Sequence, residues 1–180
     1  NLIDVGANIG QYTLIGAHLG RQVVAVEARL KHVQMIHHAV VLNGYQKHVT
    51  IVHNAVSDKH GIVNLASSRI NQGSTYIKET QSENSGTPQN ESMVAECITL
   101  DDLATSVKIP TKAIMKMDIE TYEAKALQHA NILFNKVKIP YVFIEWIGLI
   151  TKPEEDIELL LDWFKDRGYQ PHTIGKNSST

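Results

Sequence analysis

The sequence predicts an α/β fold, in which helices cover both faces of a doubly wound, mostly parallel sheet. Short apolar runs alternate with helical patterns from the first residue onward, which is typical of parallel strands joined by helices. The chain has 180 residues, 43% of them apolar, which is enough to bury one sizeable core. Polar side chains recur where the apolar runs end. We therefore expect a single domain over residues 1–180, with a polar insert at about residues 67–92.

The first half of the chain is predicted to contain three strands and two helices. In order, they are a strand over residues 2–5, a helix over residues 11–19 closed by Gly20, a strand over residues 23–26, a helix with an apolar stripe at Val33, Ile36, Val40 and Val41 that ends at Asn43-Gly44, and a strand beginning at Val49 to Val52. Apolar spacings of three and four residues indicate the helices, whereas short unbroken apolar runs indicate buried strands. Glycine directly after a helical pattern suits a helix C-terminus.

The second half adds further units of strand and helix. They are a strand over residues 113–117, a helix from about Tyr122 to Phe134, a strand over residues 141–144, a helix opened by Pro153-Glu154-Glu155 and a possible strand over residues 169–174. Proline in a first turn with acids beside it favours a helix N-terminus. The alternation of strands and helices predicts a parallel sheet.

The segment from Ser67 to Ser92 interrupts this alternation. It is rich in Ser, Asn, Gln, Gly, Thr and Glu, and the apolar runs beside it, Ile62 to Leu65 and Val94 to Ile98, could pair as an antiparallel ribbon. So long a loop in a compact domain is usually either functional or disordered. We expect either a lid or a disordered segment here.

Composition and charge exclude several classes of protein. Seventeen basic and nineteen acidic residues give a net charge of −2, and the lysines are scattered without interleaved aromatic residues, so we expect no nucleic-acid partner. The single cysteine, Cys97, excludes an internal disulfide framework and is expected to pack as a small apolar residue in a strand. No stretch reaches the ~18 to 20 apolar residues of a membrane span. We expect a cytoplasmic protein, unless a targeting or anchor segment lies outside this sequence.

Polar residues stand at or just past the carboxyl ends of the predicted parallel strands. They are Asp4, Glu27, Asn54, Asp118 and Glu145. Because ligands of doubly wound sheets bind outside these strand ends, we expect the five side chains to line one edge of the sheet.

The first strand end continues into DVGANIGQYT, residues 4–13. Gly6 and Gly10 permit a tight turn, and the N–H groups of the helix that follows point toward a ligand. A dinucleotide fingerprint requires G-x-G-x-x-G, but Asn8 and Gln11 stand where its second and third glycines would be. The loop therefore favours a nucleotide with an amino-acid end.

S-adenosylmethionine is such a nucleotide, and its ribose diol would pair with a carboxylate at the end of the second strand. Glu27 occupies that place. A nicotinamide dinucleotide, and with it an NAD-dependent oxidoreductase, is the alternative that the same strand pattern and Glu27 leave open.

A second group of acids lies in KMDIETYEAKAL, residues 116–127. Asp118 is the candidate general base for a hydroxyl acceptor, with Glu120 and Glu145 as alternates. Glu123 is explained as well by the preference of acids for a helix N-terminus. The cluster could instead hold a divalent cation that orients a diol or a phosphate.

The nine histidines do not predict a metal site. His37 and His38 are adjacent on a helix and point in different directions, and His32 is five residues from His37 rather than four. We expect solvated helix histidines and no metal ligand.

Six motifs in this order resemble FkbM-type S-adenosylmethionine-dependent methyltransferases. They are DVGANIGQYT, the acid in VVAVEA, HNAVSD, ITLDDL, KMDIETYEAKAL and YVFIEW. The resemblance runs from Leu2 to about Tyr169. It implies a Rossmann-like class I methyltransferase fold that acts on hydroxyl oxygens of sugars, lipids or natural products. Because a full fold of this class has a seventh strand, we expect the given chain to be truncated at both ends.

The resemblance also implies roles for individual residues. Asp4, Gly6, Asn8 and Gly10 would hold the methionine portion of S-adenosylmethionine, Glu27 the ribose and Asn54-Ala55 the adenine, with Ala7 and Ala28 as neighbouring cofactor contacts, while Asp118, Glu120 and Glu145 would face a small-molecule or glycan acceptor. The sequence departs from the family pattern at Thr121, where Gly is usual, and at Ala28, where Pro is usual. Thr121 and the polar insert motivate a third alternative, a non-catalytic domain that binds the cofactor or only a partner. Oligomeric state stays open.

Overall fold

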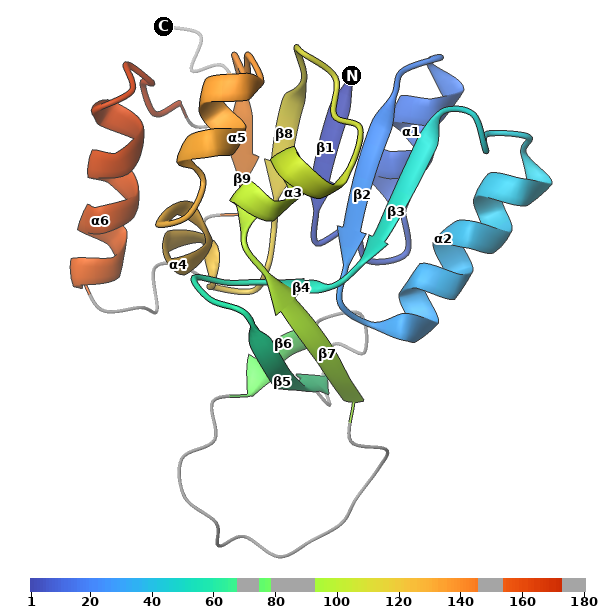
Figure 1. The fold of residues 1–180 in the computed structure, drawn as a ribbon, viewed down its shortest axis with the longest axis horizontal. Helices are drawn as coiled ribbons and strands as arrows, with labels where there is room; N and C mark the ends of the chain where they lie inside the picture. Colours follow the sequence, from blue (N-terminus) through green and yellow to red (C-terminus); the bar gives the residue numbers. More distant parts are fainter. Residues whose placement is uncertain (68–74, 79–92, 146–153, 173–180) are drawn as a thin grey trace, which may run out of the picture.

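A five-stranded parallel sheet runs through the molecule, with strand order β3-β2-β1-β8-β9 (Figure 1). The computed structural model describes residues 1–67, 75–78, 93–145 and 154–172. The strands are β1 (Leu2–Val5), β2 (Val23–Glu27), β3 (Val49–His53), β8 (Ile114–Met117) and β9 (Val142–Ile144). Strand order runs outward from β1 toward β3 on one side and from β8 toward β9 on the other, so β1 and β8 flank a topological switch point. The predicted doubly wound sheet is confirmed.

Helices pack on both faces of this sheet because its strands alternate apolar side chains between two cores. Val24 and Val26 of β2 belong to a large cluster that includes residues of α3 (Leu100–Ser106), α4 (Glu123–Leu127), α5 (Asn131–Lys136) and α6 (Glu154–Lys165). Ala25, between them, packs with Ile36 and Val40 of α2 (Leu30–Leu42). On that same face, α1 (Gln11–His18) contacts β1, β2 and α2.

A second sheet has the order β4-β7-β5-β6 and lies beyond the carboxyl ends of the first (Figure 1). Its strands are β4 (Ala55–Val56), β5 (Gly61–Ser67), β6 (Thr75–Lys78) and β7 (Met93–Ile98). β5 pairs antiparallel with β7, with Ile62 opposite Glu96, so the predicted ribbon is confirmed. The predicted loop over residues 67–92 was wrong in one part, because Thr75–Lys78 pairs antiparallel with β5. The rest of the insert lies outside the described residues.

The predicted helix from Tyr122 to Phe134 is in fact two helices, α4 and α5. Asp101, in the first turn of α3, explains the break: its Oδ1 accepts a hydrogen bond from Leu133 N–H at 3.0 Å, and its own N–H donates to His129 O at 2.9 Å. The carboxylate thereby satisfies an orphan donor at the start of α5, as an N-cap would. Sequence periodicity could not identify a cap contributed by a distant helix.

Two smaller predictions also fail. Val41 was expected to be buried in the apolar stripe of α2 but is 44% exposed. The buried side of α2 is formed by His32, Ile36 and Val40, and Val41 points away from it. Tyr169 to His172, expected to begin a strand, are not in one, and Ile174 lies outside the described residues. Tyr169 instead packs edge-on against Phe134 and Phe164, and its hydroxyl donates a hydrogen bond to the carbonyl oxygen of Ile139.

Most other predicted elements lie within about two residues of their expected places, whereas α3 and β4 were not predicted. Cys97 is buried in β7, as expected. Pro153 lies outside the described residues, and α6 begins at Glu154 with three acids in its first turn. Among the described helices, none is both long and apolar enough to cross a lipid bilayer.

Candidate active site

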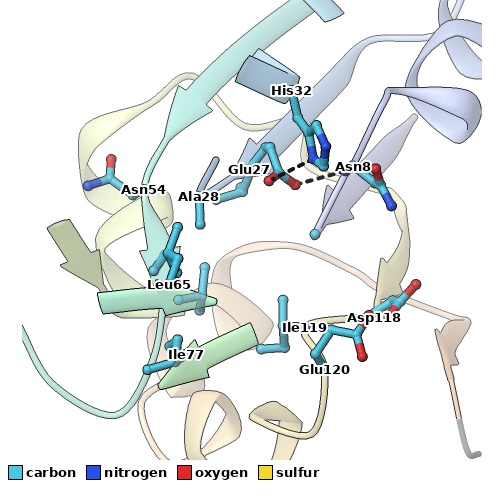
Figure 2. A pocket seen from close by; sticks show the side chains of 14 residues that line it. Asn8, Glu27, Ala28, His32, Asn54, Leu65, Ile77, Asp118, Ile119 and Glu120 are labelled. Atoms are coloured by element: carbon cyan, nitrogen blue, oxygen red, sulfur yellow. Dashed lines mark hydrogen bonds and ion pairs between the residues drawn. The ribbon is translucent and has the colours of Figure 1, made fainter. Parts of the chain in front are cut away.

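A cavity lies at the carboxyl ends of the central strands, between the two sheets (Figure 2). Eight of the predicted site residues line it: Gly6, Asn8, Glu27, Ala28, Asn54, Ala55, Asp118 and Glu120. The cavity is also lined by residues that the sequence did not single out, among them His32, Leu65, Ile77 and Ile119. It therefore spans the switch point, where ligands of such sheets bind.

Glu27 is a buried acid of the cavity whose carboxylate is held by backbone hydrogen bonds. It ends β2 and is 6% exposed, and its two carboxylate oxygens are held by different parts of the backbone. Asn8 N–H donates to Oε2 at 2.8 Å, and Arg29 N–H donates to Oε1 at 2.9 Å. These bonds fix the carboxylate in one orientation while each oxygen keeps lone-pair capacity for a ligand.

The prediction of solvated histidines was wrong for His32. Its side chain is buried, and its Nδ1 lies 3.5 Å from Oε1 of Glu27 (Figure 2). His37 and His38, on the same helix, are exposed as expected. His32 lies in the first turn of α2, and the chain between β2 and α2 folds back so that the imidazole contacts the carboxylate of Glu27. The signal available in the sequence was that His32 follows Glu27 by only five residues.

The loop after β1 has left-handed backbone at Gly6 (φ 76°), Asn8 (φ 52°) and Gly10 (φ 88°). Asn tolerates this conformation better than most residues, and Gly adopts it without penalty. A Cβ on Gly6 would lie 1.8 Å from the carbonyl oxygen of Asp118, and one on Gly10 would lie 2.9 Å from Cγ1 of Ile36. The close approaches that these glycines allow are thus contacts within the protein.

Three predicted cofactor residues, in β1 and the loop after it, face the protein interior and do not line the cavity. Ala7 packs in the small core with Ala25, and Gly10 packs against Ile36. Asp4 is fully buried and accepts a hydrogen bond from Thr13 Oγ1 at 2.6 Å. Burial raises the pKa of Asp4, against the opposing effects of the Thr13 hydrogen bond and the Lys116 charge. The structure places these residues as supports for the loop.

The predicted catalytic acids gather beyond the ends of β8 and β9. Asp118 and Glu120 line the cavity, whereas Glu145 is exposed and lies outside its lining. Partial burial and the negative charge of Asp118 raise the pKa of Glu145. The side chain of Asp118 is 33% exposed, so this end of the cavity opens toward solvent.

The turn that presents Asp118 and Glu120 has unusual backbone. Glu120 (φ 53°) and Thr121 (φ 78°) are both left-handed. Glu123, 1% exposed, accepts a hydrogen bond from Ile119 N–H at 2.9 Å through Oε1 and closes the turn. A positive φ favours Gly, the residue that the resemblance leads us to expect at the position of Thr121.

Apolar side chains form the wall opposite Glu27. Figure 2 shows Leu65, Ile77 and Ile119 across the cavity from Glu27 and Asn8. Leu65 comes from β5 and Ile77 from β6, so the second sheet supplies two of these side chains, while Ile119 comes from the turn after β8. Sequence reasoning missed Ile77 because its strand lies in the polar insert, although Leu65 stands in a predicted strand. The cavity therefore has a polar side and an apolar side.

Within the ranges that the structure describes, no group of three or more His, Cys, Asp or Glu side chains is placed to hold a metal ion. Asp118 forms an ion pair with Lys116, whose Nζ lies 3.2 Å from its Oδ2.

A sequence model described as the methyltransferase FkbM domain matches residues 4–171. This match covers most of the chain. The protein belongs to the FkbM methyltransferase family. No curated protein matches the chain in sequence.

Solved structures of three other proteins are similar in part. The methyltransferase FkbM from Methylobacillus flagellatus KT is 19% identical, with a TM-score of 0.48 over 77% of this chain and 31% of that one. Precorrin 8w decarboxylase from Methanobacterium thermoautotrophicum is 13% identical (TM-score 0.48), and precorrin-6y C5,15-methyltransferase from Geobacter metallireducens GS-15 is 10% identical (TM-score 0.49). Each of the last two matches covers 94% of this chain and 63% of the other.

Proposed function

We propose that the protein transfers a methyl group from S-adenosylmethionine to a hydroxyl oxygen of a small-molecule or glycan acceptor. The observation that carries this proposal is that one cavity contains both Glu27 and Asp118, at the ends of different strands of the sheet. A nucleoside held by Glu27 would extend across the switch point toward Asp118.

The polar side of the cavity fits the nucleoside and amino-acid parts of the cofactor. Glu27 offers fixed carboxylate oxygens to a ribose diol, and the left-handed turn around Asn8 brings Gly6 and Asn8 to the cavity wall. Asn54 and Ala55 lie beside the apolar wall, where a flat adenine ring would lose water-exposed area. Asp4, Ala7 and Gly10 then support the cofactor indirectly, through the shape of the loop.

The acidic end fits the acceptor. S-adenosylmethionine supplies an activated methyl group with a good leaving group. The protein therefore has to align the hydroxyl oxygen and exclude water, and alignment is worth up to ~7 to 11 kcal/mol in favourable systems. As the new O–C bond forms and the S–C bond breaks, Asp118 takes the hydroxyl proton. A positioned base adds a factor of about 10² to 10⁴. Glu120 and Glu145 are the alternates for this role.

Ligand binding and methyl transfer test different parts of the proposal. We expect S-adenosylhomocysteine to raise the melting temperature of the protein, since a ligand at 100 times its Kd stabilises by about 2.7 kcal/mol. Glu27→Gln should remove most of that shift, whereas Glu155→Gln, an exposed change in α6, should not. Stabilisation by NAD in place of S-adenosylhomocysteine would favour the oxidoreductase.

Asp118→Asn separates catalysis from binding. We expect it to keep the affinity for S-adenosylhomocysteine and to lose transfer of labelled methyl groups to hydroxylated compounds from a cell extract. Loss of cofactor binding in this variant would show that the division of the cavity is wrong. Cofactor binding by the unaltered protein without transfer to any acceptor would favour the non-catalytic alternative.

A further inference from the structure

His32 is a buried histidine of the cavity, and the function proposed above gives it no role. It lies in the first turn of α2, is 5% exposed and lines the same cavity as Glu27. A neutral imidazole has one ring nitrogen that donates a hydrogen bond and one that accepts. The partners of the two nitrogens therefore determine where the proton of a buried histidine lies.

The two ring nitrogens of His32 face groups of opposite hydrogen-bonding character. Nδ1 lies 3.5 Å from Oε1 of Glu27, and an ionised carboxylate can only accept (Figure 2). Nε2 lies 3.4 Å from Nη1 of Arg29, and a guanidinium group can only donate. Arg29 also donates its backbone N–H to Oε1 of Glu27 at 2.9 Å, so the three residues form a closed ring of contacts.

Of the possible forms of the imidazole, one fits both partners. A ring with its proton on Nε2 would turn a donor toward Arg29 and a lone pair toward Glu27, so both contacts would be repulsive. A doubly protonated ring would suit Glu27 but would place a second cation 3.4 Å from the guanidinium nitrogen. A neutral ring with its proton on Nδ1 accepts from Arg29 and donates toward Glu27.

We propose that His32 is a positioning residue for the cofactor ribose, held by Arg29 as the neutral tautomer whose Nδ1–H orients the Glu27 carboxylate without neutralising its charge. The charge matters because hydrogen bonds to an ionised carboxylate are stronger than those between neutral groups. The inference rests on the proposed function in naming the ribose as the ligand of Glu27. The tautomer itself follows from contacts within the protein.

Nitrogen-15 NMR of the imidazole rings tests the tautomer in the unliganded protein, because protonated and unprotonated ring nitrogens have well-separated chemical shifts. Near neutral pH we expect His32 to carry its proton on Nδ1. His53 is the matched control within the same protein, since its Nε2 lies 3.1 Å from the carbonyl oxygen of Ala28 and should carry the proton there. A proton on Nε2 of His32, or on both of its nitrogens, would overturn the inference.

Ligand affinity tests the role of His32 in holding the ribose. The probes are S-adenosylhomocysteine and the analogue whose ribose lacks both hydroxyl groups. His32→Leu should raise the Kd of S-adenosylhomocysteine roughly tenfold and leave that of the analogue nearly unchanged. His32→Asn, whose amide can donate near the position of Nδ1, should recover most of the affinity. His37→Leu is the matched control, since His37 is exposed on the same helix.

The two ligands distinguish positioning from a general contribution to folding. Equal losses of affinity for both probes in His32→Leu, or no loss for either, would overturn the inference. Failure of the unaltered protein to bind S-adenosylhomocysteine would overturn the proposed function, and it is recognised separately because the tautomer is measured without ligand. If His32→Leu does not fold, the tautomer of the unaltered protein and the affinities of His32→Asn decide.

Discussion

Individual residues at the switch point are constrained by backbone contacts as well as by chemistry. Gly6 meets the carbonyl of Asp118, and Thr121 adopts a left-handed conformation that a β-branched residue rarely tolerates. Both positions hold the turn that presents Asp118 and Glu120. Their effects on stability can be measured without knowing the acceptor.

Gly6→Ala should destabilise the protein strongly. The added Cβ would lie 1.8 Å from Asp118 O, so β1 and β8 must separate locally. Gly20→Ala is the matched control, since Gly20 also has positive φ (69°) but nothing within 4 Å of its Cβ position. We expect a loss of roughly 3 kcal/mol or more for Gly6→Ala and about 1 kcal/mol for Gly20→Ala in denaturant unfolding. Equal losses of unfolding free energy would mean that the backbone around Asp118 accommodates the added methyl group at little cost.

Thr121→Gly should stabilise the protein. The left-handed φ of 78° costs a β-branched residue about 1 to 3 kcal/mol, and glycine avoids this cost while losing some chain entropy on folding. We expect a net gain of about 0.5 to 2 kcal/mol by chemical unfolding. Thr121→Ala, which keeps a Cβ, should recover less. A destabilised Thr121→Gly variant would indicate that the Thr side chain supports the turn.

At this scale the sequence predicted which polar residues line the cavity better than it predicted their contacts. Glu27, Asn54 and Asp118 were found because polar residues at the ends of apolar runs are visible in a sequence. His32 was missed because its contact with Glu27 depends on the direction in which α2 leaves the strand. The burial of Asp4 could not be predicted for a similar reason, because nothing in the sequence shows that Thr13 and the loop close over it.

At the scale of elements, short helices are fixed by carboxylates that accept backbone hydrogen bonds. Asp101 holds the start of α5, Glu123 closes the turn before α4, and Asp102 forms a capping box with Thr99 at the start of α3. Periodicity predicted where strands and long helices lie but merged α4 with α5. The break depends on a contact between residues 101 and 133, which no local pattern reveals.

Glu123 should make stability depend on pH. Burial raises its pKa above the ordinary value of 4.5, so the folded state binds this proton more tightly than the unfolded state. The stabilisation is therefore complete below about pH 4.5 and is lost as pH rises through the pKa of the folded state. In Glu123→Gln we expect a flatter dependence of unfolding free energy on pH above 5.

Denaturant unfolding between pH 5 and pH 8 checks this prediction. Asp4 contributes a slope of the same sign, because its pKa is also raised, so the variant should keep part of the pH dependence. Asp58 and Asp102 have lowered pKa values and act only at more acidic pH. Parallel curves for the variant and the unaltered protein would show that Glu123 does not titrate differently on folding.

At the scale of the whole molecule, the cavity exists because a second sheet closes over the carboxyl ends of the first. The first sheet could be predicted, since alternation of strands and helices has few topological solutions. The ribbon of β5 and β7 could be predicted as well. The wall that they form with β6 could not, because the arrangement of two sheets is set by packing between distant segments.

Leu65→Ala should therefore weaken cofactor binding from outside the nucleotide loop. Removing apolar area from the wall opposite Glu27 should raise the Kd of S-adenosylhomocysteine roughly tenfold, measured by calorimetry. Ile62→Ala is the matched control, since Ile62 is on the same strand and is 76% exposed. The melting temperatures of both variants show whether a weaker affinity for S-adenosylhomocysteine comes from a less stable protein or from the altered wall. Equal affinities would place the cofactor away from this wall.

The pairing of β1 with β8 also has a consequence for synthesis on the ribosome. Lys116 and the Gly6 carbonyl that it contacts are 110 residues apart in the sequence, so β1 leaves the exit tunnel long before its second neighbour exists. Until then one side of β1 is an open row of N–H and C=O groups, the kind of edge that recruits strands from other nascent chains. The seam beside the proposed ligand site therefore closes only once β8 has been made, with β9 still to follow, and until residue 117 has emerged the open side of β1 is a place where chaperone protection matters.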